Sequence, residues 1–240
     1  MNKEGLSLAN IKMPKIGLGG AMYEKLSLYE SIELSLQAYK DGIKYFDGHA
    51  EYGKSEMGLG EIKKLHPEII ISTKTRGYRD IHVIHDQLSR SLYCLDKIPI
   101  YIFSNVDTES EYQKLIHLLP FFDGFKATNR IGVFGISSHY PDFILRSLND
   151  NLAIDVFMFP YNIIRKDCEK LLPLLKERNK GTIIIKPFSA GEVWNRFSPK
   201  DMLQFYADKQ DQFTSLLFGV HSLSELSEDL RLIKEIWGRI

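Results

Sequence analysis

The sequence KYFDGHAEYGKSE, residues 44–56, decides how the rest of the chain is interpreted. It begins as a short apolar run and continues into polar residues with glycines, which is typical of a buried strand that runs into a surface loop. The loop places a carboxylate, Asp47, five residues before a phenol, Tyr52. A lysine, Lys74, directly follows a second strand-like run at residues 69–73.

A phenol, an ammonium group and a carboxylate at successive strand ends suggest acid catalysis. A phenol gives up its proton poorly near neutrality, but a nearby ammonium group stabilises the phenolate and makes the phenol a better acid. A carboxylate can in turn hold the ammonium group in place. Tyr52, Lys74 and Asp47 are therefore candidate catalytic residues, which together form a proton donor for a carbonyl oxygen.

The composition indicates one globular domain without a nucleic-acid or membrane partner. The 240 residues are 44% hydrophobic, and 31 basic residues balance 31 acidic ones. A barrel of ~250 residues is typically one domain, so we expect a single domain over residues 1–240. Cys94 and Cys168 are both expected in helices, which makes a disulfide improbable. The start of the chain lacks the apolar core of a signal peptide, and no apolar run approaches ~20 residues, so we expect a cytoplasmic protein.

Short apolar runs alternate with longer amphipathic segments along the chain. After a first strand within residues 6–22, we predict strands at 44–46, 69–72, 98–103, 133–136, 156–159, 182–185 and 215–218. We predict helices at 27–41, 55–65, 80–95, 109–119, 141–148, 167–178, 199–207 and 224–237. Such alternation favours parallel strands, and eight strand-helix pairs close as a barrel. The predicted fold class is α/β, a (β/α)8 TIM barrel.

The decisive stretch resembles the aldo-keto reductases, a family of (β/α)8 barrels that reduce carbonyls with a nicotinamide cofactor. The family pattern is an Asp, then five residues later Tyr-Gly, then usually Ser-Glu and Leu-Gly. This chain matches it with Asp47, Tyr52-Gly53, Ser55-Glu56 and Leu59-Gly60. The resemblance covers the whole chain, strand by strand.

The glycines near the start are a second point of resemblance. A short strand followed by glycines would suit a dinucleotide-binding fingerprint, but the third glycine of that motif is Met22 here. The segment resembles instead the first barrel strand of the family. There Gly19 and Gly20 would let the backbone pass close to the nicotinamide.

The resemblance implies cofactor contacts at the ends of later strands. Ser137 and Ser138 stand where the family contacts the carboxamide of nicotinamide. Met158 stands at a position that is often Gln, and Tyr161 follows it. The remaining expected contacts are Lys186, Pro187 and Phe188, where many members stack an aromatic ring on nicotinamide, and, in the adenosine loop, Gly219, His221, Ser222, Glu225, Glu228 and Asp229.

One departure from the family concerns catalysis. The usual fourth catalytic residue is a histidine at the end of the fourth barrel strand. Matching without gaps places Ser104 there, and a slip of one residue would place Asn105 there. Either side chain can donate a hydrogen bond to a carbonyl, but neither can act as a histidine acid. Reduced turnover, an unusual carbonyl substrate or lost catalysis would each fit this change.

A second departure concerns the cofactor. Residues 219–230 contain no Lys or Arg, whereas the family often grips the 2′-phosphate of NADPH with one. Glu225 falls near the family's arginine position and would repel a phosphate. A helix N-terminus can still bind one through backbone N–H groups, helped by Ser222 or His221. The cofactor is therefore expected to be NADPH or NADH, with NADH used at least comparably.

The expected function is NAD(P)H-dependent reduction of an aldehyde or ketone, a small-molecule carbonyl substrate. His49 is a candidate to orient or protonate the substrate, and Trp194 to line its pocket. His49 and His139 are the histidines expected near the barrel mouth, and zinc needs about three protein ligands, so no metal is expected. A cofactor-binding regulatory protein with slow turnover is one alternative, and a barrel lyase or isomerase without nicotinamide is another. The oligomeric state is left open.

Overall fold

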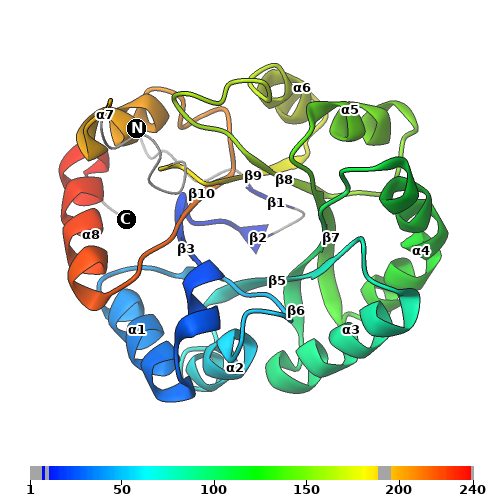
Figure 1. The fold of residues 1–240 in the computed structure, drawn as a ribbon, viewed down its shortest axis with the longest axis horizontal. Coiled ribbons are helices and arrows are strands. Elements are labelled where there is room, and N and C mark those ends of the chain that lie inside the picture. Colours follow the sequence, from blue (N-terminus) through cyan, green and yellow to red (C-terminus); the bar gives the residue numbers. More distant parts are fainter. Residues whose placement is uncertain (1–6, 9–10, 189–195, 239–240) are drawn as a thin grey trace.

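The computed structural model describes residues 7–8, 11–188 and 196–238. In this part of the chain, eight strands form a closed barrel in the order β10-β3-β4-β5-β6-β7-β8-β9, and every pair is parallel (Figure 1). The predicted fold class is confirmed. The strands are β3 (Ile16–Gly19), β4 (Tyr45–Asp47), β5 (Ile70–Arg76), β6 (Ile98–Ser104), β7 (Ile131–Ser137), β8 (Val156–Pro160), β9 (Gly181–Ile185) and β10 (Ser215–Phe218).

Helices surround the barrel, one after each strand (Figure 1). They are α1 (Leu28–Lys40), α2 (Ser55–Leu65), α3 (Ile81–Leu95), α4 (Glu109–Ala127), α5 (Pro141–Asn149), α6 (Leu171–Glu177), α7 (Pro199–Ala207) and α8 (Leu223–Trp237), and a 3-10 helix, η1 (Ala21–Lys25), precedes α1. Side-chain caps fix several starting points: Ser27, Asp80 and Thr108 each accept a backbone N–H in the first turn of the following helix.

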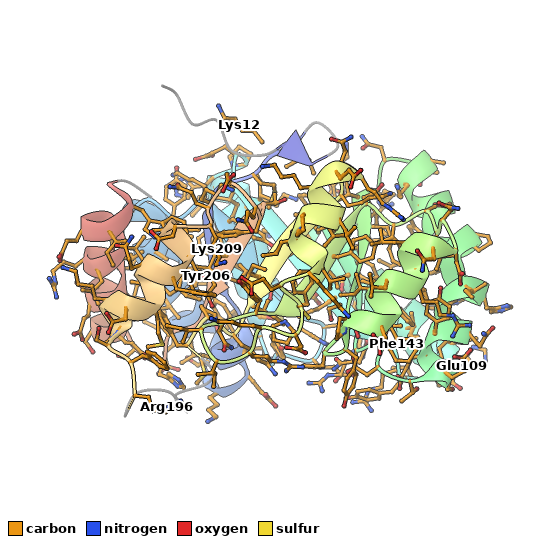
Figure 2. All side chains as sticks on the ribbon, turned by 90° about the horizontal axis from the view of Figure 1, so that it is seen from above. Lys12, Glu109, Phe143, Arg196, Tyr206 and Lys209 are labelled. Carbon is orange, nitrogen blue, oxygen red and sulfur yellow. The ribbon has the colours of Figure 1, made fainter. Side chains whose placement is uncertain are left out.

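A small antiparallel hairpin, β1 (Ser7–Leu8) and β2 (Ile11–Lys12), precedes the barrel. Figure 1 shows it at the barrel centre, on the far side of the view. In Figure 2, Lys12 of β2 and Arg196, which follows β9 and precedes α7, lie at opposite faces of the molecule. The hairpin therefore covers the face where the strands begin, and the opposite face, where the strands end, is left for a functional site.

Two apolar layers stabilise the fold. The barrel interior is filled by Met13, Tyr45, Ile100, Ile102, Val133, Val156, Met158, Ile183 and Leu217. A larger cluster lies between the strands and the helices. Along β6, Ile100 and Ile102 face inward and Tyr101 and Phe103 face outward, whereas Ile98 belongs to the outer cluster.

Three elements differ from the prediction by four residues or more at one end. α4 continues through Pro120 to Ala127, because Phe121, Phe122 and Phe125 behind the proline pack against the outer layer. β5 continues to Arg76, so Lys74 lies within the strand instead of directly after it. α6 begins only at Leu171, and Cys168 lies in the turn before it. Among the described residues, no helix has the length and apolar character needed to cross a bilayer.

Candidate functional site

A buried ion pair lies at the junction of β4 and β5. The two strands are neighbours, with Asp47 paired in register with Ser72. Lys74 Nζ donates to Asp47 Oδ2 and to the backbone oxygen of Gly48, the latter at 2.7 Å. Only 6% of Lys74 and 4% of Asp47 is exposed to solvent, so the two charges are compensated mainly by each other and by hydrogen bonds.

A hydrogen-bonded chain fixes the second oxygen of the Asp47 carboxylate. Ser72 Oγ donates to Asp47 Oδ1 at 2.7 Å, and the Tyr45 hydroxyl lies 2.9 Å from Ser72 Oγ. Since Ser72 gives its only proton to the carboxylate, Tyr45 must donate to Ser72. Burial first, and Asp47 second, raise the pKa of Tyr45 well above its ordinary value, so Tyr45 stays a donor. The carboxylate is therefore oriented from the barrel interior.

Tyr52 lies above this pair, on the loop between β4 and α2. Lys74 Nζ is 5.2 Å from the centroid of the Tyr52 ring. The loop is a tight turn, because the N–H of Tyr52 donates to His49 O at 3.0 Å and the N–H of Ser55 donates to Tyr52 O at 2.9 Å. Gly53, with φ of 53°, makes this turn without strain. The structure thus brings together Asp47, Tyr52 and Lys74, the three residues that were predicted to act as one unit.

His49 packs against Tyr52, with ring centroids 4.6 Å apart and an angle of 33° between the rings. It is only 2% exposed. Burial, and then the positive charges of Lys74, Arg76 and Arg79, lower the pKa of His49 to about 2. The ring is therefore neutral near pH 7, and a neutral imidazole is a poor acid, which argues against the proton-donating role that the sequence suggested.

Glu51 connects this loop to the end of β5. Its carboxylate contacts Arg76 Nε at 2.9 Å, and it accepts from Arg79 Nε at 2.6 Å and Gln87 Nε2 at 2.9 Å. The hydrogen bond from Arg79, opposed by burial, holds the pKa of Glu51 below its ordinary value. The sequence did not predict this group of Glu51, Arg76, Arg79 and Gln87, since the four residues are separated along the chain and belong to no motif.

Ser104 and Asn105, the two candidates to replace the histidine of the family, both make hydrogen bonds at the end of β6. Ser104 Oγ donates to the backbone oxygen of Thr75 at 2.9 Å, and the hydroxyl also lies 3.3 Å from Asn105 Oδ1. Asn105 has φ of 60°, and its amide donates weakly to Asp107 at 3.4 Å. Ser104 would therefore have to give up its bond to Thr75 to donate to a substrate, whereas Asn105 makes only a weak bond through its amide N–H group.

A second polar network, which the sequence did not reveal, joins the ends of β6, β7 and β9. Asp107 accepts from the backbone N–H of His139 at 2.7 Å and from Ser138 Oγ at 3.0 Å, and it lies 2.8 Å from His139 Nδ1. Burial raises the pKa of Asp107, but the bonds from His139 and Ser138 outweigh burial and keep it low. His139 Nε2 lies 3.2 Å from Lys186 Nζ. The hydroxyl of Ser138 also binds the backbone of Tyr140, so it braces the loop.

Several expected cofactor residues have other surroundings. The fully buried ring of Tyr161 packs in the outer apolar cluster, and its hydroxyl donates to Glu169 at 2.9 Å. Met158 belongs to the interior core. Position 20 needs glycine for steric reasons, because a Cβ there would lie 2.0 Å from the backbone oxygen of Asp47. Trp194 lies outside the described residues.

The remaining expected cofactor residues lie at the ends of β7, β9 and β10. Ser137 is the last residue of β7, and its Oγ accepts from the N–H of Asn105 at 3.3 Å. Pro187 and Phe188 follow β9 and are buried, whereas Lys186 is exposed with φ of 56°. Beside Gly219 there is open space, since a Cβ at that position would meet no described atom within 4 Å.

The helix α8, which follows the loop after β10, begins with several acidic residues. Ser222 caps the helix by accepting from the N–H of Glu225 at 3.2 Å, and Glu225 accepts from the N–H of His221 at 2.6 Å. Asp229 is 7% exposed, and burial, then Glu225 and Glu228, raise its pKa to about 7. These carboxylates therefore already repel one another without a phosphate nearby.

Comparison with known proteins agrees with this architecture. The sequence profile of the aldo/keto reductase family matches residues 15–236. A search of curated proteins found no match. Among solved structures, the holo form of the aldo-keto reductase AKR11C1 from Bacillus halodurans is similar with a TM-score of 0.82 and 19% identity, over 98% of this chain and 91% of that one.

Two further solved structures have a similar fold. A protein from Pseudomonas aeruginosa described as an aldo-keto reductase has a TM-score of 0.81 and 18% identity, over 98% of both chains. An aldo/keto reductase from Brucella melitensis has a TM-score of 0.72 and 14% identity, over 95% of this chain and 96% of that one. At such identities these likenesses establish the fold, and the family follows from the sequence profile. The chain belongs to the aldo-keto reductase family.

Proposed function

We propose that this protein reduces an aldehyde or ketone to an alcohol with NADH or NADPH. The observation that carries the proposal is the buried Asp47–Lys74 pair, whose ammonium group lies 5.2 Å from the ring of Tyr52. An ammonium group has three N–H donors. Two of those on Lys74 are taken by Asp47 and Gly48, which leaves one for the phenol oxygen.

In this mechanism, Tyr52 gives its proton to the carbonyl oxygen. Lys74 favours the phenolate that remains, and Asp47 holds Lys74 in position with the support of Ser72. When bound, the reduced nicotinamide supplies the hydride that the carbonyl carbon receives. The tight turn from His49 to Ser55 keeps the phenol over the ammonium group, so no large rearrangement is needed before proton transfer.

The cofactor would be held by residues at the ends of β7, β9 and β10. Ser137, Lys186, Pro187 and Phe188 are proposed for the nicotinamide half. The space beside Gly219 and the backbone N–H groups at the start of α8, capped by Ser222, suit a phosphate group. The residues present therefore fit a dinucleotide in outline, with an unfavourable acidic cluster on its adenosine side.

Transfer of a labelled hydride tests the proposal. The protein is incubated with a panel of neutral and anionic aldehydes and ketones and with NADH or NADPH that carries deuterium at both C4 positions. We expect at least one alcohol product with a single deuterium on its carbinol carbon, detected by mass spectrometry. Tight cofactor binding without turnover on any carbonyl would instead support a regulatory cofactor-binding protein. That second function is favoured by the engagement of Ser104 and Asn105 with other protein groups.

We also predict weak discrimination between the two cofactors. Selective binding of NADPH needs a cation at the 2′-phosphate, whereas the start of α8 offers Glu225, Glu228 and Asp229. The helix N-terminus contributes only ~0.3–1 kcal/mol at an exposed site. Fluorescence titration should therefore give NADH an affinity at least comparable to that of NADPH. A hundredfold preference for NADPH, or ~2.8 kcal/mol, would contradict this.

The cofactor preference should also depend on pH. Since the pKa of Asp229 is about 7, its carboxyl group is mostly neutral at pH 6 and mostly charged at pH 8. The affinity ratio should therefore move toward NADPH at pH 6, helped by partial protonation of the phosphate itself. In Asp229→Asn, which carries no charge at either pH, the shift between pH 6 and pH 8 should become smaller.

A further inference from the structure

We propose that His49 donates, through Nε2–H, the hydrogen bond to the carbonyl oxygen that the family takes from a histidine at the end of the fourth barrel strand. The inference rests on the proposed carbonyl reduction and assigns a second group to the same oxygen. In this assignment Tyr52 remains the acid, and His49 stabilises the negative charge that develops on the oxygen before the proton arrives.

The position where the family has its histidine offers no ready donor. The hydroxyl proton of Ser104 is directed to the backbone oxygen of Thr75 in the neighbouring strand. The amide of Asn105 faces Asp107, and its backbone N–H faces Ser137. Donation by Ser104 to a substrate would break a bond that ties β6 to β5, and the Asn105 amide is directed toward Asp107 of its own loop, which points to a donor on another element.

His49 lies beside the phenol that delivers the proton. Its ring packs at 4.6 Å from the ring of Tyr52, and its backbone oxygen accepts from the N–H of Tyr52 at 3.0 Å. Ser55 Oγ, in the first turn of α2, donates to the same oxygen at 3.1 Å. His49 and Tyr52 therefore belong to one turn, which places the imidazole ring beside the phenol that a carbonyl oxygen would have to reach.

Hydrogen bonding decides which nitrogen of His49 carries the proton. The backbone N–H of Glu51 donates to Nδ1 at 2.9 Å, so Nδ1 presents its lone pair and the neutral ring carries its proton on Nε2. Glu51 is itself held by Arg79 and Gln87, which fixes the donor. Among the described residues, no hydrogen bond takes up the Nε2–H of His49. Burial, and then the positive charges nearby, keep the ring neutral, so it acts as a hydrogen-bond donor and not as an acid.

Kinetics of two His49 variants test the role. His49→Phe keeps a ring against Tyr52 and removes the N–H, and we expect kcat and kcat/KM to fall together by ~10²–10³-fold, as for loss of one oxyanion donor. His49→Gln, which restores an N–H donor, should recover about tenfold. The pH profile of each variant should keep its limbs where the wild type has them, because His49 does not titrate in the working range. Cofactor affinity should stay within about threefold.

A matched control separates this role from packing. His85 of α3 stacks on Phe121 of α4 with ring centroids 4.1 Å apart, so His85→Phe makes the same exchange against a stacked ring on the helices outside the barrel. It should keep wild-type kcat. The inference is overturned if His49→Phe retains more than a third of wild-type kcat, or if its pH profile loses a limb.

Ring-labelled ¹⁵N NMR decides the inference even without turnover. We expect the signal of a neutral His49 with its proton on Nε2 from pH 5 to pH 9, and a shift of that Nε2–H signal when benzamide, a carbonyl that is not reduced, is added with reduced cofactor. A proton on Nδ1, a charged ring at pH 7 or an unmoved signal each contradicts the assignment. Lack of wild-type turnover, by contrast, contradicts the proposed function and leaves the shift with benzamide to decide the role of His49.

Discussion

Replacing Tyr52 by phenylalanine should lower kcat for carbonyl reduction by ~10²–10⁴-fold, the usual contribution of a positioned general acid. The phenol is the group beside the Asp47–Lys74 pair that can give up a proton, since the pKa of about 2 leaves His49 as a neutral imidazole, which is too weak an acid to do so. Cofactor affinity and melting temperature should change little, because the Tyr52 hydroxyl makes no hydrogen bond to any other described residue. Steady-state kinetics and cofactor fluorescence measure the two effects separately.

A second tyrosine provides the control for this change. Tyr29 of α1 is 74% exposed on the outside of the barrel, so Tyr29→Phe removes a hydroxyl without touching the strand ends. Its kcat should equal that of the wild type. If Tyr52→Phe kept undiminished turnover, the proton donor would have to be another group, and the assignment of the whole Asp47–Tyr52–Lys74 unit would fail.

The barrel could be predicted from the sequence because strands and helices space their apolar residues differently. Strands such as β7 and β8 are short apolar runs bounded by polar residues, and helices such as α3 repeat their apolar residues at helical spacing. Where the predicted helix ended too early, packing outweighed the tendency of proline to end a helix. α4 continues past Pro120 because its phenylalanines are buried against the barrel, and burial outweighs the loss of one backbone hydrogen bond.

The candidate site could be predicted only where it follows one continuous motif. Asp47 and Tyr52 are five residues apart, and their roles depend on strand order, which the motif implies. The network of Asp107, His139 and Lys186 involves three strand ends, and no local pattern indicates that these side chains meet. Tyr161 shows the same limit in reverse, since the chain position suggests the barrel mouth but the side chain faces the helices. The face to which a side chain at a strand end points depends on the register of that strand with its neighbours, since a shift of one residue turns every side chain to the other face.

Replacing Lys74 by methionine should destabilise the fold by ~3–5 kcal/mol, because it leaves the buried carboxylate of Asp47 without its counter-charge. For a chain of this size, 1 kcal/mol corresponds to ~2–4 °C, so the melting temperature should fall by roughly 6–20 °C. Urea unfolding and thermal melting measure the loss. The control is Lys64→Met, whose partner Glu61 lies 2.6 Å away on the surface of α2, and this change should cost less than ~1 kcal/mol.

The double variant Asp47→Asn/Lys74→Met separates stability from catalysis. Removing both charges avoids an unpaired buried ion, so the double variant should be more stable than Lys74→Met, with a coupling of ~0.5–3 kcal/mol in the double-mutant cycle. Turnover should not return with stability, because the ammonium group that favours the phenolate of Tyr52 is still missing. Additive losses would mean that the pair does not act as one unit. Recovered turnover would mean that Lys74 serves only the fold, since a purely structural lysine can be dispensed with once its partner is neutral.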